Sequence, residues 1–193
     1  MALVKDISII KKNSKTFYLA SSFLPYDVKK NVLEVYAFCR LYDDSVDLQL
    51  HNNLDSLQSK IKHLNLNEKV IEQLKIGIDS DRNFKRYNNI HELIQYSYRV
   101  AGCVGLIMCD LMSVKNDKHK FHAIDLGIAM QLTNIARDVI EDKKMDREYI
   151  KPDFENIQAT LKLADMFYES SFSSIQKIPF RYKFSIIVAR RIY

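Results

Sequence analysis

Glycine and proline are scarce in this chain, and tryptophan is absent. Its 193 residues include four glycines and three prolines. An all-β protein reverses direction about every dozen residues and draws on these residue types for its turns, so the composition argues against that class. Hydrophobic residues make up 47% of the chain, which is enough for one buried core. We therefore expect an all-α fold of long helices joined by short polar loops, in a single domain over residues 1–193.

The chain also lacks a cysteine framework and a long apolar run. The three cysteines are odd in number and show no C-x-x-C spacing, which argues against a disulfide scaffold or a zinc site and favours a reducing compartment. The longest apolar stretch, residues 100–112, contains Asp110, whereas a membrane-spanning helix needs about 20 apolar residues. Charged residues interrupt the N-terminus before the core of a signal peptide could form. We expect a cytoplasmic protein without a spanning helix.

The sequence lacks the motifs that mark several common enzyme chemistries. No G-x-S-x-G motif, P-loop or dinucleotide fingerprint is present. His119 and His122 have helical spacing but no third partner, so we expect the histidines to lie on the surface. The net charge of +5 favours anionic partners, among them nucleic acid, lipid surfaces and phosphorylated small molecules. Because the basic residues are scattered in pairs and no nucleic-acid motif accompanies them, we expect no nucleic-acid partner.

Two acidic stripes at helical spacing are the most informative feature that is present. At about 100° per residue, each stripe falls on one face of a helix, and we predict these helices over residues 28–46 and 121–141. The first stripe consists of Tyr36, Arg40, Asp43 and Asp47, and the second of Gln131, Asn134, Asp138 and Asp142. Two aspartates four residues apart destabilise a helix by about 0.2–0.5 kcal/mol, so stripes that retain such spacing favour a bound cation. Magnesium prefers oxygen ligands of this kind. Merely solvated acidic faces are the alternative, and they would leave the arginine, the asparagine and the glutamine unexplained.

A third predicted helix contains two interior glycines. Asn89 is a candidate N-cap for this helix, which carries Tyr96 and Val100 on one face and Gly102 and Gly105 in its interior. A glycine inside a helix costs about 1 kcal/mol relative to alanine. Close helix packing and room for a ligand both explain the pair, and both explanations stay open at this point.

Four stretches of the chain together resemble the squalene/phytoene synthase family, the head-to-head prenyl diphosphate synthases. They are residues 14–17, 35–47, 96–105 and 131–142, which occur in the family's order and extend over essentially the whole chain. Arg147 and Tyr149, ahead of Pro152, echo a further family stretch. The motif Asn-Ile-Ala-Arg-Asp at residues 134–138 is most similar to that of bacterial phytoene synthases.

The resemblance implies an isoprenoid-synthase-type helical bundle around a central cavity, in which two aspartate-rich helices face each other. Carried over residue by residue, it implies metal and diphosphate ligands at Asp43, Asp47, Asn134, Asp138 and Asp142, of which the four aspartates are the catalytic residues. It implies substrate-binding residues at Ser14, Phe17, Tyr36, Arg40, Tyr96, Val100, Val104, Gly105, Gln131 and Arg137. The implied metal is Mg²⁺, with Mn²⁺ as an alternative. Phe38 is a further candidate for the cavity wall.

The chain departs from the family pattern at a few places. Asn13 and Ile140 stand where many members have His and Gly, and neither change removes an implied metal ligand. The stretch between Asp47 and Gly77 is shorter than in typical members, and relatives continue beyond Tyr193 with further helices. We therefore expect a bundle that lacks the family's C-terminal helices.

The activity that the resemblance implies is the 1'-1 condensation of two prenyl diphosphates through a cyclopropylcarbinyl diphosphate. Two geranylgeranyl diphosphates would give phytoene, for carotenoid biosynthesis, and no NADPH is expected for that product. One alternative is a squalene or presqualene diphosphate synthase that uses farnesyl diphosphate, for which squalene formation would require NADPH. A second alternative is a non-catalytic member acting in assembly or interaction, which would be expected to lose its aspartates, whereas this chain retains them. Long hydrocarbon substrates and product predict peripheral contact with membrane lipid.

Overall fold

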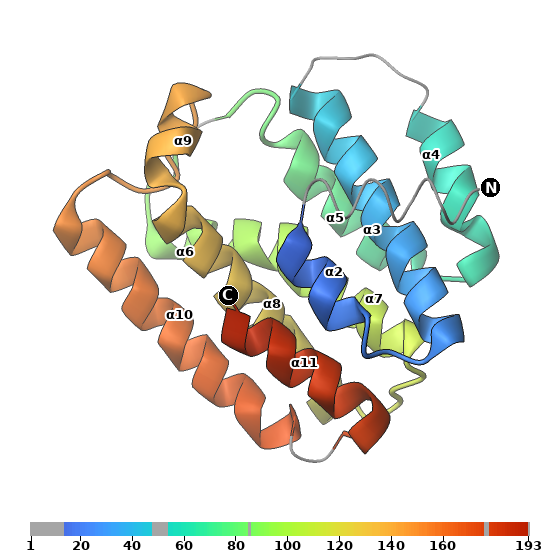
Figure 1. The fold of residues 1–193 in the computed structure, drawn as a ribbon. Helices are drawn as coiled ribbons and strands as arrows, with labels where there is room; N and C mark the ends of the chain where they lie inside the picture. The colour runs from blue at the N-terminus through green and yellow to red at the C-terminus, as the bar shows by residue number, and fades with distance from the viewer. Residues whose placement is uncertain (1–13, 48–53, 85, 176–177, 193) are drawn as a thin grey trace.

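Every regular element that the structure describes is a helix. The computed structural model describes residues 14–47, 54–84, 86–175 and 178–192, and these ranges contain no strand. The elements are α2 (Lys15–Ser21), α3 (Tyr26–Asp47), α4 (Leu54–Ile61), the 3₁₀-helix η1 (Lys62–Leu64), α5 (Glu68–Asp79), α6 (Ile90–Ser97), the π-helical segment η2 (Tyr98–Gly102), α7 (Cys103–Leu111), α8 (Asp117–Arg137), α9 (Val139–Lys144), α10 (Phe154–Ile175) and α11 (Phe180–Ile192) (Figure 1). The all-α prediction is confirmed. The prediction of one domain over residues 1–193 also concerns residues outside these ranges and stays a prediction.

Polar side chains fix where several helices begin. The Asn89 side chain accepts hydrogen bonds from the backbone N–H groups of His91 and Glu92, at 2.9 and 3.1 Å, so Asn89 is the N-cap that the sequence predicts. Glu92 in turn accepts a hydrogen bond from the backbone N–H of Asn88 at 2.9 Å. The Ser14 hydroxyl caps α2 in the same manner, by accepting from the N–H of Phe17 at 3.2 Å. These bonds satisfy donors that the first turn of a helix leaves unpaired.

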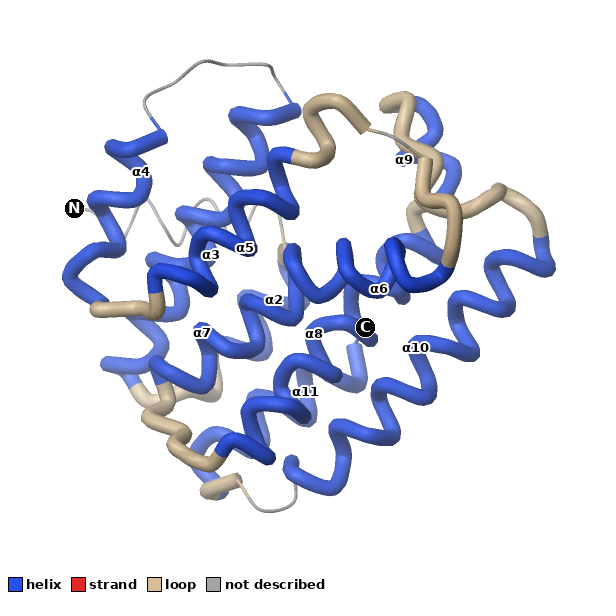
Figure 2. The backbone as a smooth tube through the Cα atoms, turned by 180° about the vertical axis from the view of Figure 1, so that it is seen from behind, coloured by secondary structure: helices blue, strands red, loops and turns tan. Residues whose placement is uncertain are grey.

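Helix α8 lies between two layers of the bundle. Helix α10 packs along one side of α8, and η2 with α7 packs along another side (Figures 1 and 2). Helix α3 packs against α4, α5 and α7, and α11 packs against α2. Separate apolar clusters hold these groups together, one around Tyr42 and Ile107, one around Leu93 and Leu132, and one around Val32 with partners on α11. The two helices that carry the acidic stripes are therefore anchored in different parts of the core.

The helix break at Asp138 differs from the single helix predicted over residues 121–141. The structure begins α8 at Asp117, behind the N-cap Asn116, and ends it at Arg137. Asp138 then adopts φ −99° and ψ 12° before α9 begins. Even so, the N–H of Asp138 donates to the carbonyl of Asn134 at 2.8 Å, and the N–H of Asp142 donates to the carbonyl of Asp138 at 2.9 Å. Side-chain spacing did not reveal the break because the four-residue repeat continues through it.

The four glycines of the chain all lie where helices approach closely. A Cβ atom at Gly105 would lie 2.2 Å from the carbonyl oxygen of Ala123 on α8, and one at Gly127 would lie 2.3 Å from the carbonyl oxygen of Ala101. Close packing therefore accounts for Gly105. The predicted helix around it also contains a π-helical turn at residues 98–102, where an unbroken α-helix was expected. Such turns occur frequently at functional sites.

No helix in the described ranges has the length and apolarity that crossing a bilayer requires. This finding agrees with the absence of a long apolar run in the sequence.

The glycine contacts give a test of the packing. We expect Gly105→Ala to lower the free energy of unfolding by about 1–3 kcal/mol, because its Cβ would meet the Ala123 backbone, which cannot move aside. Gly102→Ala is the matched control, since its Cβ would meet side-chain atoms of Tyr98 and Ile124 at 3.0 and 3.2 Å, and these can shift. Urea denaturation of both variants measures the difference. Equal stability of the two variants would contradict the close contact at Gly105.

Candidate active site

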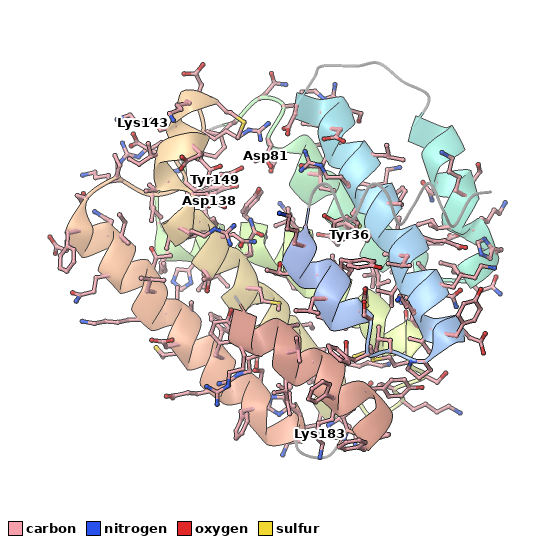
Figure 3. The ribbon with its side chains drawn as sticks, viewed as in Figure 1. Tyr36, Asp81, Asp138, Lys143, Tyr149 and Lys183 are labelled. Carbon is pink, nitrogen blue, oxygen red and sulfur yellow. The ribbon has the colours of Figure 1, made fainter. Side chains whose placement is uncertain are left out.

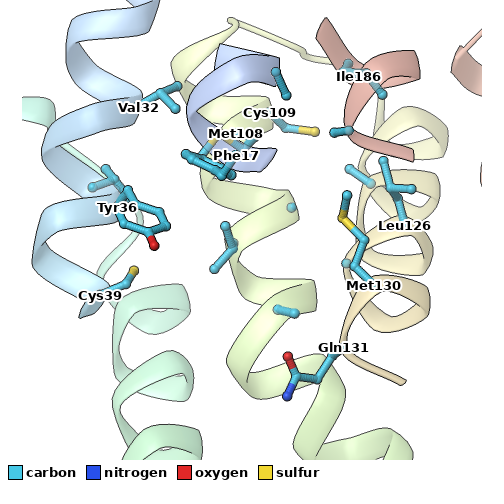
Figure 4. Close-up of a pocket in the computed structure, with 18 of the residues that line it drawn as sticks. Phe17, Val32, Tyr36, Cys39, Met108, Cys109, Leu126, Met130, Gln131 and Ile186 are labelled. Atoms are coloured by element: carbon cyan, nitrogen blue, oxygen red, sulfur yellow. The ribbon is translucent and has the colours of Figure 1, made fainter. Parts of the chain in front are cut away.

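A cavity of about 490 Å³ lies within the bundle, lined mainly by residues from α2, α3, η2, α7, α8 and α11, with further residues from α5, α6 and α10. Its lining changes from apolar to polar in the same direction along α3 and α8. On α3 the lining passes from Val32 and Tyr36 to Asp43, and on α8 it passes from Leu126 through Gln131 to Asn134. Figure 4 shows Val32 and Tyr36 on α3, with Leu126 and Gln131 on α8. The separation of eleven positions from Val32 to Asp43 corresponds to about 17 Å along the helix. The end near Asp43 and Asn134 is therefore polar, and aliphatic and aromatic side chains predominate in the rest of the lining.

Most of the predicted site residues line this cavity. They are Phe17, Tyr36, Arg40, Asp43, Tyr96, Val100, Val104, Gly105, Gln131 and Asn134. The remaining predicted site residues are not part of its lining. Ser14 caps α2, whereas Asp47, Arg137, Asp138 and Asp142 lie beyond the polar end, around the termini of α3, α8 and α9.

Two expectations from the sequence are wrong in the structure. His119 and His122 line the cavity, although surface positions were expected, because the N-terminal half of α8 turns them toward it. Phe38 was expected in the cavity wall but is buried in the core, with its ring 6.0 Å from that of Tyr42. It lies on the face of α3 that packs against α5 and α7.

The first acidic row lies on the last turns of α3. Arg40 forms ion pairs with Asp43 at 3.0 Å and with Asp44 at 2.6 Å. Burial, together with the nearby charge of Asp47, raises the pKa of Asp43 to about 6. Three aspartates beside one arginine leave this end of α3 with net negative charge. Such a site favours a cation or a group that brings cations with it.

The second row crosses the junction of α8 and α9. Asp138 is held by its neighbour Arg137 through hydrogen bonds of 2.7 and 2.6 Å. Burial and the charge of Asp138 raise the pKa of Asp142 to about 6. One turn earlier, the Oδ1 atom of Asn134 is buried and has no hydrogen-bond partner among the described residues. An unpaired buried amide oxygen costs free energy, so this atom is suited to accept a bond from a ligand or to coordinate a cation.

Arg147 lies between the two rows. It donates a hydrogen bond to Oδ1 of Asp47 at 2.6 Å, and this ion pair joins the segment after α9 to the end of α3. The charge of Arg147 also acts on Asp43 and Asp142, where it opposes the rise in both pKa values. The pKa of Arg147 itself is raised, because its hydrogen bond to Asp47 and the charge of Asp81 outweigh its burial. Both rows therefore border one polar space.

A buried carboxyl group, Asp81, is a site residue that the sequence did not indicate. The hydroxyls of Tyr96 and Tyr149 donate to its two oxygens at 2.8 and 2.7 Å, and the two hydroxyl oxygens lie 3.0 Å apart. The Asp81 and Tyr149 side chains lie on the same side of the bundle as Asp138 (Figure 3). Burial raises the pKa of Asp81 even though both hydroxyls bond to it. Asp81 follows α5 in a turn, where no periodicity marks it, and the only sequence signal at Tyr149 is its place in a family-like stretch.

The donor set suits a shared metal site rather than a closed metal cage. Among the residues that the structure describes, no group of three or more His, Cys, Asp and Glu side chains is arranged to hold a metal ion. Magnesium in phosphate sites is commonly held by one or two carboxylates, with phosphate oxygens and waters completing its shell. Asp43 and Asp142, which border one space and whose ionisation is disfavoured by burial, fit that arrangement. The unpaired oxygen of Asn134 adds a further donor.

Comparison with known proteins finds relatives over most of the chain. The family model described as squalene/phytoene synthase matches residues 10–65 and 49–171, which include both acidic stripes. The chain is similar to the phytoene synthase of Rhodobacter capsulatus, with 29% identity over 233 residues, covering 96% of this chain and 69% of that protein. It is 28% identical to the 4,4'-diapophytoene synthase of Staphylococcus haemolyticus, covering 73% of this chain and 59% of that protein. The crystal structure of a dehydrosqualene synthase in complex with ligand superposes with a TM-score of 0.86 and 30% identity, covering 99% of this chain and 83% of that chain.

The raised pKa of Asp43 predicts how stability depends on pH in the absence of divalent metal. The folded protein holds this proton up to about pH 6, whereas the unfolded chain releases it near pH 4, so stability falls as pH rises through that window. Asp43→Asn should therefore raise Tm by about 2–4 °C near pH 7.5, a shift that corresponds to about 1 kcal/mol in a domain of this size, and the figure is kept small because the side chain is 34% exposed. Near pH 4, where the folded Asp43 is protonated and the unfolded one is about half protonated, the advantage should be much smaller.

Thermal denaturation in EDTA at both pH values measures the effect. Asp165→Asn on the exposed face of α10 is the control and should leave Tm unchanged. Arg40 keeps its partner Asp44 in the test variant. A lower Tm for Asp43→Asn than for the wild type near pH 7.5 would contradict the expectation that ionised Asp43 destabilises the fold.

Proposed function

The chain belongs to the squalene/phytoene synthase family, and we propose that it condenses two prenyl diphosphates head to head, with two geranylgeranyl diphosphates giving phytoene. Its bundle is of the isoprenoid-synthase type, as the sequence predicted. The observation that carries the proposal is one cavity whose apolar part leads to a polar end, and two acidic rows border that end. A long hydrocarbon and a diphosphate need these two environments side by side. The proposed location is the cytoplasmic face of a membrane.

The polar end supplies groups for binding diphosphate. Arg40 and Gln131 line the cavity there, and Arg40 has an Nε atom with no partner among the described residues. Charge-assisted hydrogen bonds from arginine to phosphate oxygens are short and strong. When bound between the acidic rows, Mg²⁺ would neutralise diphosphate oxygens and stabilise the departing group as a Lewis acid. Asp43, Asp47, Asn134, Asp138 and Asp142 are the residues proposed to hold it.

The apolar depth supplies the environment that an allylic cation needs. The Phe17 and Tyr36 rings stack at 4.9 Å between centroids, and both line the cavity. Aromatic faces attract cations, and aliphatic walls such as Val100 and Val104 exclude the water that would otherwise quench the cation. These residues therefore protect the reacting carbon on the side away from the diphosphate.

The hydrogen-bonded cluster of Asp81, Tyr96 and Tyr149 is proposed to hold in place the chain segments where the polar and apolar parts of the cavity meet. Asp81 and Tyr96 both line the cavity, and Tyr149 ties them to the segment that carries Arg147. The stacked rings of Tyr96 and Tyr149, 5.0 Å apart, keep this cluster rigid. One buried carboxyl thus fixes three segments of the chain around the polar space.

Formation of a C30 product is the second candidate, and it is favoured by the similarity of this chain to a dehydrosqualene synthase and a 4,4'-diapophytoene synthase. A squalene-forming reaction would add a requirement for NADPH. A non-catalytic assembly role is less well supported, because all the proposed metal ligands are present. The identity of the substrate decides between the C40 and C30 products.

Incubation with purified substrate tests the proposal. With geranylgeranyl diphosphate and Mg²⁺, we expect phytoene without added NADPH, detected by chromatography with mass spectrometry. Asp138→Ala should lower the rate by at least about 100-fold, because removal of a group that stabilises charge in the transition state has an effect of that order. The control Asp165→Ala, on exposed α10, should retain the wild-type rate. A C30 hydrocarbon from farnesyl diphosphate alone would favour the second candidate, and no product from either substrate would overturn the proposal.

A variant of Arg147 tests, without measuring turnover, whether metal binds in the polar space between the two acidic rows. Arg147→Gln removes the cation between the rows, so in EDTA we expect Tm to fall by about 4–8 °C, which is what about 2 kcal/mol produces in a domain of this size. Adding Mg²⁺ should then raise the Tm of the variant more than that of the wild type, because the ion supplies the missing charge. Arg86→Gln is the control, since Arg86 is 52% exposed and pairs with Glu148 nearby. If Mg²⁺ shifts all three proteins equally, Arg147 does not share its space with the metal.

A further inference from the structure

An exposed aromatic patch covers the corner where α2, α3 and α11 meet. We define the aromatic patch as Leu19, Phe23, Tyr26, Phe180 and Phe184. Phe180 is 82% exposed and Tyr26 is 70% exposed. The rings of Phe23, in the turn after α2, and Phe184, on α11, meet edge to face at 4.7 Å, so this part of the patch joins the turn to α11. Figure 1 shows the start of α11 beside the turn from α2 to α3. Contiguous exposed apolar surface of this kind marks an interaction site.

The helices that present the patch also line the cavity. Ala20 and Leu24 on one side, and Ser185 and Ile186 on the other, contribute to the cavity lining. The Ser185 hydroxyl donates to the carbonyl of Ala20 at 2.6 Å, which joins α11 to α2. A single layer of two helices therefore separates the aromatic patch from the apolar part of the cavity.

The aromatic patch lies far from the acidic rows. Tyr26 stands at the first turn of α3 and Asp43 near its last turn, and this separation of seventeen positions corresponds to about 26 Å along the helix. A surface that contacts this patch would therefore leave the diphosphate end of the cavity in water.

Lysines flank the patch on two of its helices. Lys30 is exposed and stands four residues after Tyr26 on α3, and Lys183 stands three residues after Phe180 on α11. Lys29 lies over the ring of Tyr18 at 5.6 Å, and Asp27 is the acidic residue in the first turn of α3. Protein–protein interfaces are depleted in lysine. Aromatic side chains beside lysines are typical of surfaces that bind anionic lipid.

We propose that the aromatic patch docks the protein on the surface of an anionic lipid bilayer. Aromatic rings would enter the headgroup region, while the lysine ammonium groups stay at the level of the lipid phosphates. The wall formed by α2 and α11 would then face the bilayer, and the enzyme would be held beside the membrane that contains its hydrocarbon substrates and product. This last step rests on the proposed function, whereas the docking itself does not.

Vesicle flotation of the full chain tests the docking. The double variant Tyr26→Ser/Phe180→Ser removes the two most exposed rings of the patch, whose removal should not disturb the core. We expect wild type to float with phosphatidylcholine–phosphatidylglycerol vesicles, and the double variant to bind them at least about tenfold more weakly. Phe154→Ser is the matched control, because Phe154 is 78% exposed at the start of α10, away from the patch, and should bind as wild type. Lys30→Gln should weaken binding to these vesicles and leave any binding to pure phosphatidylcholine unchanged.

Binding of the double variant at wild-type strength would overturn the proposal, as would failure of the wild type to bind anionic vesicles. A wild-type dimer in size-exclusion chromatography that the double variant loses, without vesicle binding, would assign the patch to a second copy of the chain instead. Turnover separates this proposal from the proposed function. With substrate in detergent the double variant should match the wild type, and with substrate in vesicles it should be slower. Vesicle binding without any turnover would leave the docking intact and reject the function.

Discussion

Confinement of like charge around one polar space is the constraint on which this structure depends. Asp43 and Asp142 come from helices in different parts of the core, yet burial and neighbouring carboxylates raise the pKa of each to about 6. Arg147 bridges the gap through its ion pair with Asp47. Such an arrangement is unfavourable without a counter-ion, so the bundle must hold the two rows together by packing elsewhere. The apolar clusters and the close glycine contacts supply that packing.

Helical periodicity explains which parts of the site could be predicted. Residues such as Arg40 and Asn134 repeat every three or four positions on long helices, so their common face follows from helix geometry alone. The N-cap Asn89 was predictable because capping is a local interaction. Asp81 was not, since it lies in a turn and acquires its role through partners 15 and 68 residues away.

The misplaced residues show a second limit of periodicity. His119 and His122 have the spacing of an exposed face, but the cavity takes the place of solvent on that side of α8. Phe38 was a candidate for the cavity wall because it is aromatic, yet it turns into the core against Tyr42. A pattern along one helix separates its faces, but only the neighbouring helices determine whether a face meets core, cavity or water.

The change of polarity along α3 and α8 connects the site to the surface. Apolar lining residues precede Asp43 on α3 and precede Gln131 and Asn134 on α8, and the acidic rows follow at the C-terminal ends of these helices and on α9. Because the cavity follows these helices, its apolar depth must lie near the turn that leads into α3, where the aromatic patch is exposed. Charge and hydrocarbon are thus separated along the same helices. A protein with this gradient can keep its diphosphate-binding end away from lipid while its apolar end meets lipid, because α3 presents the two environments about 26 Å apart.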